Sequence, residues 1–119
     1  MLRSPIPRQR TSLTRLEIKI MPQLLVTNPS TTVPAQLSTV PKNYQWVTFI
    51  ACKSLQGPTA SPNTGKVYLG FSATANQQPL ELAPGAQLTI LVGAAQMYDF
   101  SQLYLAVLNA NDGIVAFYL

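Results

Sequence analysis

Few residues in this chain have the chemistry that catalysis or metal binding requires. The sequence contains no histidine and a single cysteine, Cys52. Without histidine the chain has no Ser-His-Asp triad, no Cys-His dyad and no histidine-containing metal site. Cys52 ends an apolar stretch, and the neighbouring Lys53 points to the opposite face of an extended chain, so nothing in the sequence activates the thiol. We therefore expect Cys52 to be buried and unreactive.

Two other candidates for chemistry have structural explanations. Gly65-Lys66 is similar to the end of a phosphate-binding loop, but the glycine that such a loop requires five residues earlier is absent. Asp99 has no second carboxylate nearby in the sequence with which to share acid and base roles. Asp99 and Ser101 instead flank Phe100, and both can bond neighbouring backbone N–H groups in a turn that directs Phe100 into the core. We expect no catalytic, cofactor-binding or metal-binding residues, and a protein that is not an enzyme.

The charged residues are concentrated in the first twenty positions. Five basic residues face one acid, Glu17, in this segment, whereas three lysines balance three acids in the remainder. The formal charge of +4 therefore belongs to residues 1–20, and only 10% of the whole chain is charged. About a quarter is charged in a typical soluble protein, and a surface with so few charges packs readily into assemblies. The basic residues of this arm are Arg3, Arg8, Arg10, Arg15 and Lys19.

The arm also carries a strand-like pattern. Leu16, Ile18 and Ile20 alternate with charged residues, which is the period of a half-buried strand. We expect the arm to extend over a neighbouring protein, where its apolar side adds a strand and its basic side meets acidic or carbonyl-rich surface. The residues assigned to partner binding are Arg3, Arg8, Arg10, Arg15, Leu16, Ile18 and Lys19.

Three interpretations of the basic arm compete with partner binding. It could bind nucleic acid through phosphate contacts, although residues 1–20 have no aromatic side chain for base stacking. It could also be a solvated tail or an organelle transit peptide, which is typically rich in arginine and poor in acidic residues.

The rest of the chain has the pattern of an all-β protein. Ten prolines and six glycines divide the chain into apolar segments too short for helices. Residues 21–43 are a Pro/Ser/Thr-rich strand and connection, and residues 44–119 are the body. The sequence predicts a small antiparallel β-sandwich or jelly-roll-like barrel, with residues 1–20 as an extended N-terminal arm. The strands expected in the body cover residues 44–52, 66–71, 80–82, 87–92, 102–108 and 114–119.

Two turns between these strands are marked by their residue types. Pro84-Gly85 suits the centre of a type II turn, because proline fixes φ at the second position and glycine supplies a positive φ at the third. Asn111-Asp112-Gly113 predicts a tight turn, since all three residue types tolerate positive φ.

Aromatic side chains have two uses in such a body. Filling the core is the ordinary role. Strands that are apolar on both faces, however, carry more apolar surface than one sandwich interior can hold. We therefore expect Trp46 and Tyr118 to contact another subunit. A tryptophan or tyrosine exposed on a loop-facing surface would instead favour a carbohydrate-binding role.

Short motifs in the second half of the chain resemble a known module. They are Val67-Tyr68-Leu69-Gly70, residues 79–85, residues 88–90, residues 99–105 and residues 115–119, in that order. Their order and spacing resemble a small β-sandwich module of tailed-bacteriophage virion structural proteins, of the head decoration or cement, neck or fibre-base type. The resemblance covers about residues 44–119. It implies a fold and a setting, and the family offers no catalytic residues to transfer.

These observations predict a non-enzymatic phage virion structural protein, which docks on major capsid or neck proteins and stabilises the particle as a decoration or cement protein. We expect a homo-oligomer, with a trimer as the form that suits a symmetric shell, located in the virion and assembled in the host cytoplasm. No cofactor is expected, and no membrane association, because the sequence has no run of about 20 apolar residues. Two different functions compete with this prediction, namely a basic nucleic-acid-binding accessory protein that uses its arm and a carbohydrate-binding fibre-tip domain.

Overall fold

The computed structural model describes residues 22–92 and 98–119. This part of the chain is all β apart from one short 3-10 helix, η1 (Phe100–Gln102), and it has no helix long and apolar enough to cross a membrane. The strands are β1 (Gln23–Thr27), β2 (Ala35–Gln36), β3 (Asn43–Tyr44), β4 (Trp46–Ile50), β5 (Val67–Gly70), β6 (Leu80–Leu82), β7 (Gln87–Leu91), β8 (Tyr98–Asp99), β9 (Tyr104–Val107) and β10 (Gly113–Tyr118).

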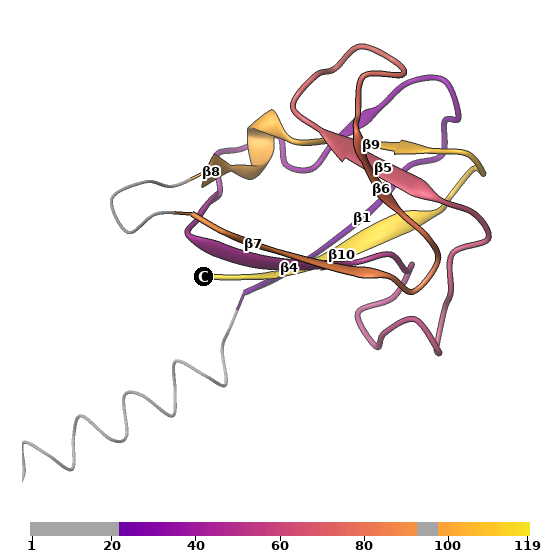
Figure 1. Cartoon of the computed structure of the whole chain (residues 1–119), viewed down its shortest axis with the longest axis horizontal. Helices are drawn as coiled ribbons and strands as arrows, with labels where there is room; N and C mark the ends of the chain where they lie inside the picture. The colour runs from indigo at the N-terminus through magenta and orange to yellow at the C-terminus, as the bar shows by residue number, and fades with distance from the viewer. Residues whose placement is uncertain (1–21, 93–97) are drawn as a thin grey trace, which may run out of the picture.

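The strands form a two-layered sandwich. Sheet A has the order β1-β10-β4-β7, sheet B has the order β2-β9-β5-β6, and β3 and β8 form a separate pair. Figure 1 shows the two sheets as layers packed face to face, with β8 and η1 at one end of the sandwich. All strand pairs are antiparallel, which confirms the fold class predicted from the sequence.

The first half of the chain pairs with the second half in reverse order. β1 pairs with β10, β2 with β9, β3 with β8, β4 with β7, and β5 with β6. The chain is therefore one long antiparallel ribbon, closed at its far end by the connection between β5 and β6. Two further pairs, β10 with β4 and β5 with β9, roll this ribbon into the two sheets. This is the arrangement of a jelly roll, and it includes β1 and β2 in the sandwich together with residues 44–119.

The core lies between the sheets because successive side chains in a strand point to opposite faces. On β4, Val47 and Phe49 are fully buried, whereas Trp46, Thr48 and Ile50 face away from sheet B and are half-buried. The buried core cluster consists of Leu37, Tyr44, Val47, Phe49, Ala51, Val67, Leu69, Leu82, Phe100, Leu103, Leu105, Val107, Ile114 and Ala116.

The strand expected over residues 44–52 is divided at Gln45, which separates β3 from β4. Tyr44 and Val47 are both buried in the core, although a strict period of two would place them on opposite faces. At the break, the amide of Gln45 donates to the carbonyl oxygen of Leu119, and its carbonyl oxygen accepts from the amide of Val92. The break therefore shifts the alternation so that the aromatic ring of Tyr44 also reaches the core.

The type II turn predicted at Pro84-Gly85 is present in the structure. The amide of Ala86 donates to the carbonyl oxygen of Ala83 at 2.9 Å, and Gly85 has φ of +81°. These are the hydrogen bond and the backbone conformation of a type II turn.

The segment Asn111-Asp112-Gly113 differs from the simple tight turn that was expected. Only Asn111 has a positive φ, of +72°. Gly113 begins β10, and a Cβ atom there would lie 2.5 Å from the carbonyl oxygen of Val26. Glycine is therefore required at this position for close approach of β1 and β10, and Asp112 is fully buried between these two residues.

The turn at Asp99 confirms its structural role. The Asp99 carboxylate accepts hydrogen bonds from the backbone amides of Ser101 (2.9 Å) and Lys42 (3.0 Å). These bonds, that from Ser101 first, hold the pKa of Asp99 below its ordinary value, because they stabilise the charged form. The cap directs Phe100 into the core, where it is fully buried.

Tyr44 carries a buried hydroxyl group that has no hydrogen-bond partner. Its ring stacks on that of Phe100 with 4.6 Å between ring centroids. Burial raises the pKa of Tyr44 to about 12, with a smaller contribution from the nearby Tyr98. The hydroxyl therefore stays neutral at ordinary pH and donates to nothing.

We expect Tyr44→Phe to raise the free energy of unfolding by about 1 kcal/mol, because a buried polar group without a partner costs about 1–3 kcal/mol. The measurement is urea unfolding followed by the fluorescence of Trp46, the single tryptophan of the chain. A clear loss of stability would show that the hydroxyl has a partner, for example an ordered water.

Candidate functional site

The arm residues assigned to partner binding lie outside the described part of the chain, so their role stays a prediction. They are Arg3, Arg8, Arg10, Arg15, Leu16, Ile18 and Lys19. The structure does place the other two predicted contact residues, Trp46 and Tyr118, and it describes the body against which an arm would act.

The outer face of sheet A, which points away from sheet B, collects apolar side chains from all four strands. The strand register aligns Leu25 of β1 with Val115 of β10, and Val115 with Ile50 of β4. Trp46 of β4 is in turn aligned with Leu91 of β7. The apolar residues of this outer face are Leu25, Trp46, Ile50, Leu91, Val115, Phe117 and Leu119.

This outer face carries no charged side chain. Its polar residues are glutamines and threonines, and the hydroxyl groups of Thr48 and Thr89 hydrogen-bond to each other at 2.8 Å across β4 and β7. Antiparallel sheets with one solvated face normally alternate apolar residues inside with polar residues outside. The outer face of sheet A departs from that alternation, so both faces of the sheet are suited to burial. Its polar residues are Gln23, Thr27, Thr48, Gln87 and Thr89.

Several of these apolar side chains are open to solvent. The exposed fraction is 76% for Leu91, 59% for Leu119 and 39% for Leu25. Val115 is only 1% exposed although it is not part of the core cluster, and Trp46, Ile50 and Phe117 are half-buried. Exposed apolar side chains therefore lie at the rims of the outer face, around more buried ones, and exposed apolar surface is typical of interaction sites.

The two predicted contact residues fall on different sides of sheet A. Trp46 lies on the outer face, where its carbonyl oxygen accepts a hydrogen bond from the amide of Leu119 at 3.0 Å. Tyr118 follows the opposite alternation, and its ring meets Phe100 edge-on with 4.7 Å between centroids. Tyr118 packs against the core cluster and remains half-buried at the edge of the interior. The two residues therefore do not share one contact surface.

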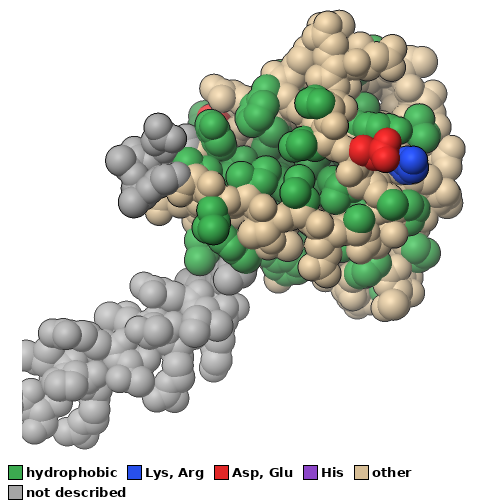
Figure 2. All heavy atoms as spheres, in the orientation of Figure 1, with side chains coloured by type: hydrophobic (Ala, Val, Ile, Leu, Met, Phe, Trp, Pro, Cys, Tyr) green, Lys and Arg blue, Asp and Glu red, His purple; other side chains and the backbone are tan. Residues whose placement is uncertain are grey.

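A second apolar surface lies along the edge strands β6 and β7. Figure 2 shows hydrophobic side chains gathered between the two layers on the side where β6 and β7 lie in front. Leu88 and Ile90 of β7 are half-buried against the core, and Leu80 of β6 is exposed. The ion pair of Lys66 with Glu81 (3.3 Å) lies in the open beside them. β7 therefore presents apolar side chains on both of its faces.

Among the described residues, no further strand pairs with the outer edges of β1 and β7. β1 (QLLVT) and β7 (QLTIL) each have five residues, and neither contains a charge or a proline. Edge strands usually carry charged residues or proline, which prevent association with another chain. An unprotected edge of this length can accept an added strand through backbone hydrogen bonds.

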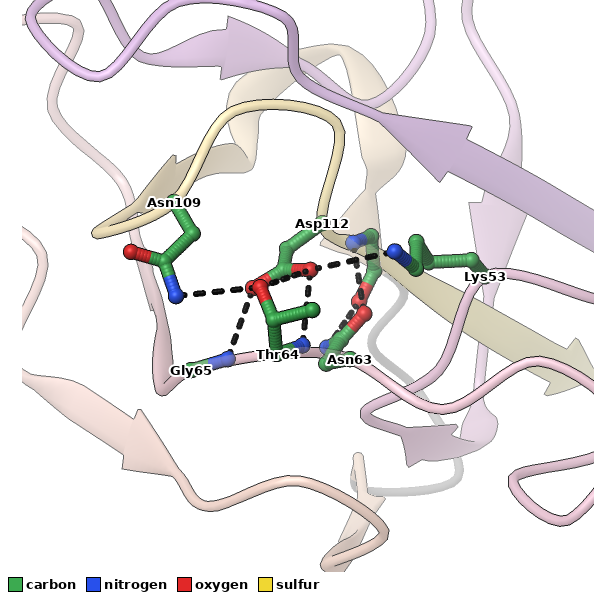
Figure 3. A network of polar contacts seen from close by, with 7 residues as sticks. Lys53, Asn63, Thr64, Gly65, Asn109 and Asp112 are labelled. Atoms are coloured by element: carbon green, nitrogen blue, oxygen red, sulfur yellow. Dashed lines mark hydrogen bonds and ion pairs between the residues drawn. The ribbon is translucent and has the colours of Figure 1, made fainter.

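One polar cluster stands out inside the molecule, around the buried carboxylate of Asp112 (Figure 3). The carboxylate accepts hydrogen bonds from the backbone amides of Thr64 and Gly65, both at 2.9 Å, and from the Thr64 hydroxyl at 3.2 Å. The ammonium group of Lys53 lies 3.6 Å away. The side chain of Asn109 donates to the Thr64 hydroxyl at 3.0 Å and closes the cluster.

The chemistry of this cluster is structural. Asn63 exchanges two hydrogen bonds with the backbone of Gly113, at 2.8 and 2.9 Å, so the loop before β5 is fastened to the start of β10. Asp112 has no second carboxylate beside it for acid–base work, and the described residues include no group of three or more metal-ligating side chains. Cys52 is buried nearby, and its thiol donates weakly to the carbonyl oxygen of Ser54 at 3.4 Å.

Asp112 was not singled out from the sequence, because the Asn-Asp-Gly triplet is typical of an exposed turn. The apolar, charge-free outer face of sheet A, rather than this cluster, is the candidate functional site. Comparison of the chain with protein-family models, with curated proteins and with solved structures finds no match.

Proposed function

We propose that this protein is a non-enzymatic structural protein of tailed-bacteriophage particles, which docks on capsid or neck proteins and stabilises the particle as a decoration or cement protein. The outer face of sheet A carries the proposal. It carries seven apolar side chains and no charge, and three of the seven, Leu25, Leu91 and Leu119, are exposed on a chain of which only 10% is charged. A protein that worked alone in solution would gain nothing from such a face, whereas a subunit covered by a partner buries it.

The size of this face explains why an arm is useful. Four strands spaced about 4.8 Å apart, three with five residues and one with six, each residue rising about 3.4 Å, give a footprint of roughly 300 Å². A specific interface covers about 800 Å² on each partner. This footprint is smaller than such an interface, and an arm of about twenty residues lying along the partner would supply further area.

The fold and the sequence resemblance support the same proposal. Jelly rolls occur in viral capsid proteins, and also in lectins and cupins, so the fold alone does not decide the function. The short motifs of residues 67–119 add the resemblance to phage virion modules. The unprotected edges of β1 and β7 add places where a strand from a neighbouring subunit would pair. In this proposal the protein is a homo-oligomer in the virion, and a trimer suits the symmetry of the shell.

The outer face is tested by adding charge at its two rims. We expect the double variant Leu25→Asp with Leu91→Asp to abolish oligomer formation and binding to particles, because two buried carboxylates without partners would oppose docking. The control is Val40→Asp with Leu55→Asp, which removes two comparably exposed apolar side chains from other parts of the surface. The measurements are the light-scattering mass, which for a monomer is 13.0 kDa, and co-sedimentation with phage particles.

Two results would contradict the proposal. The first is a parent protein that is monomeric and binds no particle. The second is a protein that carries nucleic acid at low salt, releases it at high salt and loses this property without residues 1–20. That result would favour a nucleic-acid-binding function, since phosphate contacts weaken steeply with salt. The ratio of ultraviolet absorbance by nucleic acid to that by protein shows whether the purified protein carries nucleic acid, and so distinguishes a structural protein from a nucleic-acid-binding one.

A further inference from the structure

A pocket of about 430 Å³ lies on the outer face of sheet B, on the opposite side of the sandwich from the proposed docking face. Its floor includes Tyr68 of β5 and Ala106 of β9, which are partners in the strand register and alternate with core residues. The connection between β1 and β2 forms one wall, with residues 30–34, and the connection between β5 and β6 forms the other, with Asn76 and Gln78. The volume falls in the range of about 300–1,000 Å³ that is typical of small-molecule sites.

A buried amide holds the first wall in place. Asn28 is almost completely buried, and its side-chain nitrogen donates to the carbonyl oxygens of Val33 and Leu105, both at 2.9 Å. Its side-chain oxygen accepts from the amide of Ser30 at 2.9 Å. The Ser30 hydroxyl then accepts from the amides of Thr32 (3.2 Å) and Val33 (3.0 Å). The wall is therefore formed before any ligand arrives, which lowers the entropic cost of binding.

A second buried amide holds the other wall and leaves an acceptor unused. The side-chain nitrogen of Gln78 donates to the carbonyl oxygens of Ser72 (2.6 Å) and Thr74 (2.9 Å). These two acceptors fix which end of the amide is nitrogen. Gln78 is 6% exposed, and its side-chain oxygen is buried without a hydrogen-bond partner. Most buried polar atoms have a partner, and this oxygen belongs to a residue that lines the pocket, so a ligand donor that reaches it would satisfy it.

The lining of the pocket selects for an uncharged ligand. It contains no Asp, Glu, Lys or Arg side chain. Hydroxyl groups of residues 30–32 and Tyr68, together with the amides of Asn76 and Gln78, provide both donors and acceptors. Apolar surface comes from Val33 and from the ring of Tyr68. Phosphates and carboxylates are normally bound by Arg or Lys, and this pocket offers neither.

We propose that this pocket binds a neutral saccharide. A sugar ring has the two properties that the lining matches, which are hydroxyl groups that donate and accept hydrogen bonds and apolar C–H faces that pack on an aromatic ring. Tyr68 packs against the C–H face, the hydroxyl groups of residues 30–32 bond the ring hydroxyls, and Gln78 accepts a hydrogen bond through its unused oxygen. The pocket does not depend on the docking function. A subunit held through sheet A would nevertheless present it outward.

The test uses the full chain labelled with ¹⁵N. The probes are glucose, galactose, mannose and N-acetylglucosamine with their neutral oligosaccharides, and sialylated oligosaccharides serve as charged comparators. We expect at least one neutral sugar to shift the backbone amides of residues 30–33 and the side-chain amide of Gln78. Tyr68→Ala should weaken this binding at least tenfold. The matched control, Tyr104→Ala, removes a half-buried tyrosine of the same sheet that does not line the pocket, and should leave binding unchanged.

The fold of each variant is checked by its melting temperature, so that lost binding is not confused with unfolding. Ala106→Leu provides a second variant and should also weaken binding, because a larger side chain on the floor fills part of the pocket. The proposal is overturned if no neutral sugar shifts the pocket amides, if only the sialylated probes do, or if Tyr104→Ala weakens binding as much as Tyr68→Ala. The mass and particle-binding measurements on the Leu25 and Leu91 variant are separate, so failure of one proposal leaves the other standing.

Discussion

Replacing Asp112 with alanine is expected to lower the free energy of unfolding by about 3–5 kcal/mol, the loss typical of breaking a buried, hydrogen-bonded charge pair. The substitution removes the acceptor of the backbone amides of Thr64 and Gly65 and the partner of Lys53. A fully buried donor left without an acceptor costs about 1–3 kcal/mol, and the part-buried amides of Thr64 and Gly65 should each cost up to that amount. Since native domains are stable by only about 5–15 kcal/mol, this loss is a large share of the total.

Two variants test this explanation by urea unfolding. Glu81→Ala breaks the ion pair with Lys66, whose atoms are closer (3.3 Å) but whose side chains are half exposed, and should cost at most about 1 kcal/mol. Asp112→Asn keeps one carbonyl oxygen as an acceptor but turns an amino group toward a backbone donor, so an intermediate loss is expected. Similar losses for Asp112→Ala and Glu81→Ala would show that burial and backbone bonding are not the source of the stability.

The position of Asp112 explains why its loss should reach beyond one loop. The carbonyl oxygen of Asp112 accepts from the amide of Asn28 at 3.0 Å, and the amide of Asn111 donates to the carbonyl oxygen of Asn28 at 2.8 Å. The side chain of Asn28 in turn holds residue Val33 at the wall of the pocket on sheet B. The Asp112 cluster therefore connects the loop before β5, the start of β10 and the connection after β1.

Local signals in the sequence were sufficient to predict most strands and two turns, those at Pro84-Gly85 and at Asp99. The strand expected over residues 87–92 is β7, because its alternating apolar residues pack on one side against the core. Pro84-Gly85 forms the predicted turn because the proline ring fixes φ, and because glycine, which has no Cβ atom, permits the positive φ of the next position. The cap at Asp99 was predictable for the same reason, as its hydrogen bond to Ser101 spans two residues.

Local sequence signals could not predict which distant segments pair with each other. β2 has only two residues, in a Pro/Ser/Thr-rich stretch, and becomes a strand because Ala35 is aligned with Leu105 of β9. Asp112 looks like an exposed turn residue until the loop with Thr64 folds over it, 48 residues away in the sequence. The charge-free outer face depends on the same kind of information, since only the strand register brings Leu25 and Trp46 onto one surface.

Replacing Phe100 with alanine is expected to cost about 3–5 kcal/mol, the range for deleting a buried phenylalanine. Its ring contacts three other aromatic rings: it stacks on Tyr44 at 4.6 Å and meets Tyr118 and Phe49 edge-on at 4.7 and 6.2 Å between centroids. These rings come from β3, β10 and β4, so Phe100 joins the β3–β8 pair to sheet A. Rigid rings on three sides would prevent the cavity from closing, and the loss should lie in the upper half of the range.

The matched comparison is Phe71→Ala. Phe71 is 56% exposed and lies near one aromatic ring, that of Tyr98 at 5.6 Å, so its truncation should cost less than about 1 kcal/mol. Phe100→Leu, which keeps most of the apolar volume, should fall between the two. Unfolding in urea, with circular dichroism as the signal, orders the three variants. An equal loss for Phe71→Ala and Phe100→Ala would mean that the aromatic cluster does not hold the β3–β8 pair on the sandwich, and that the pair is stabilised by its backbone bonds and the Asp99 cap alone.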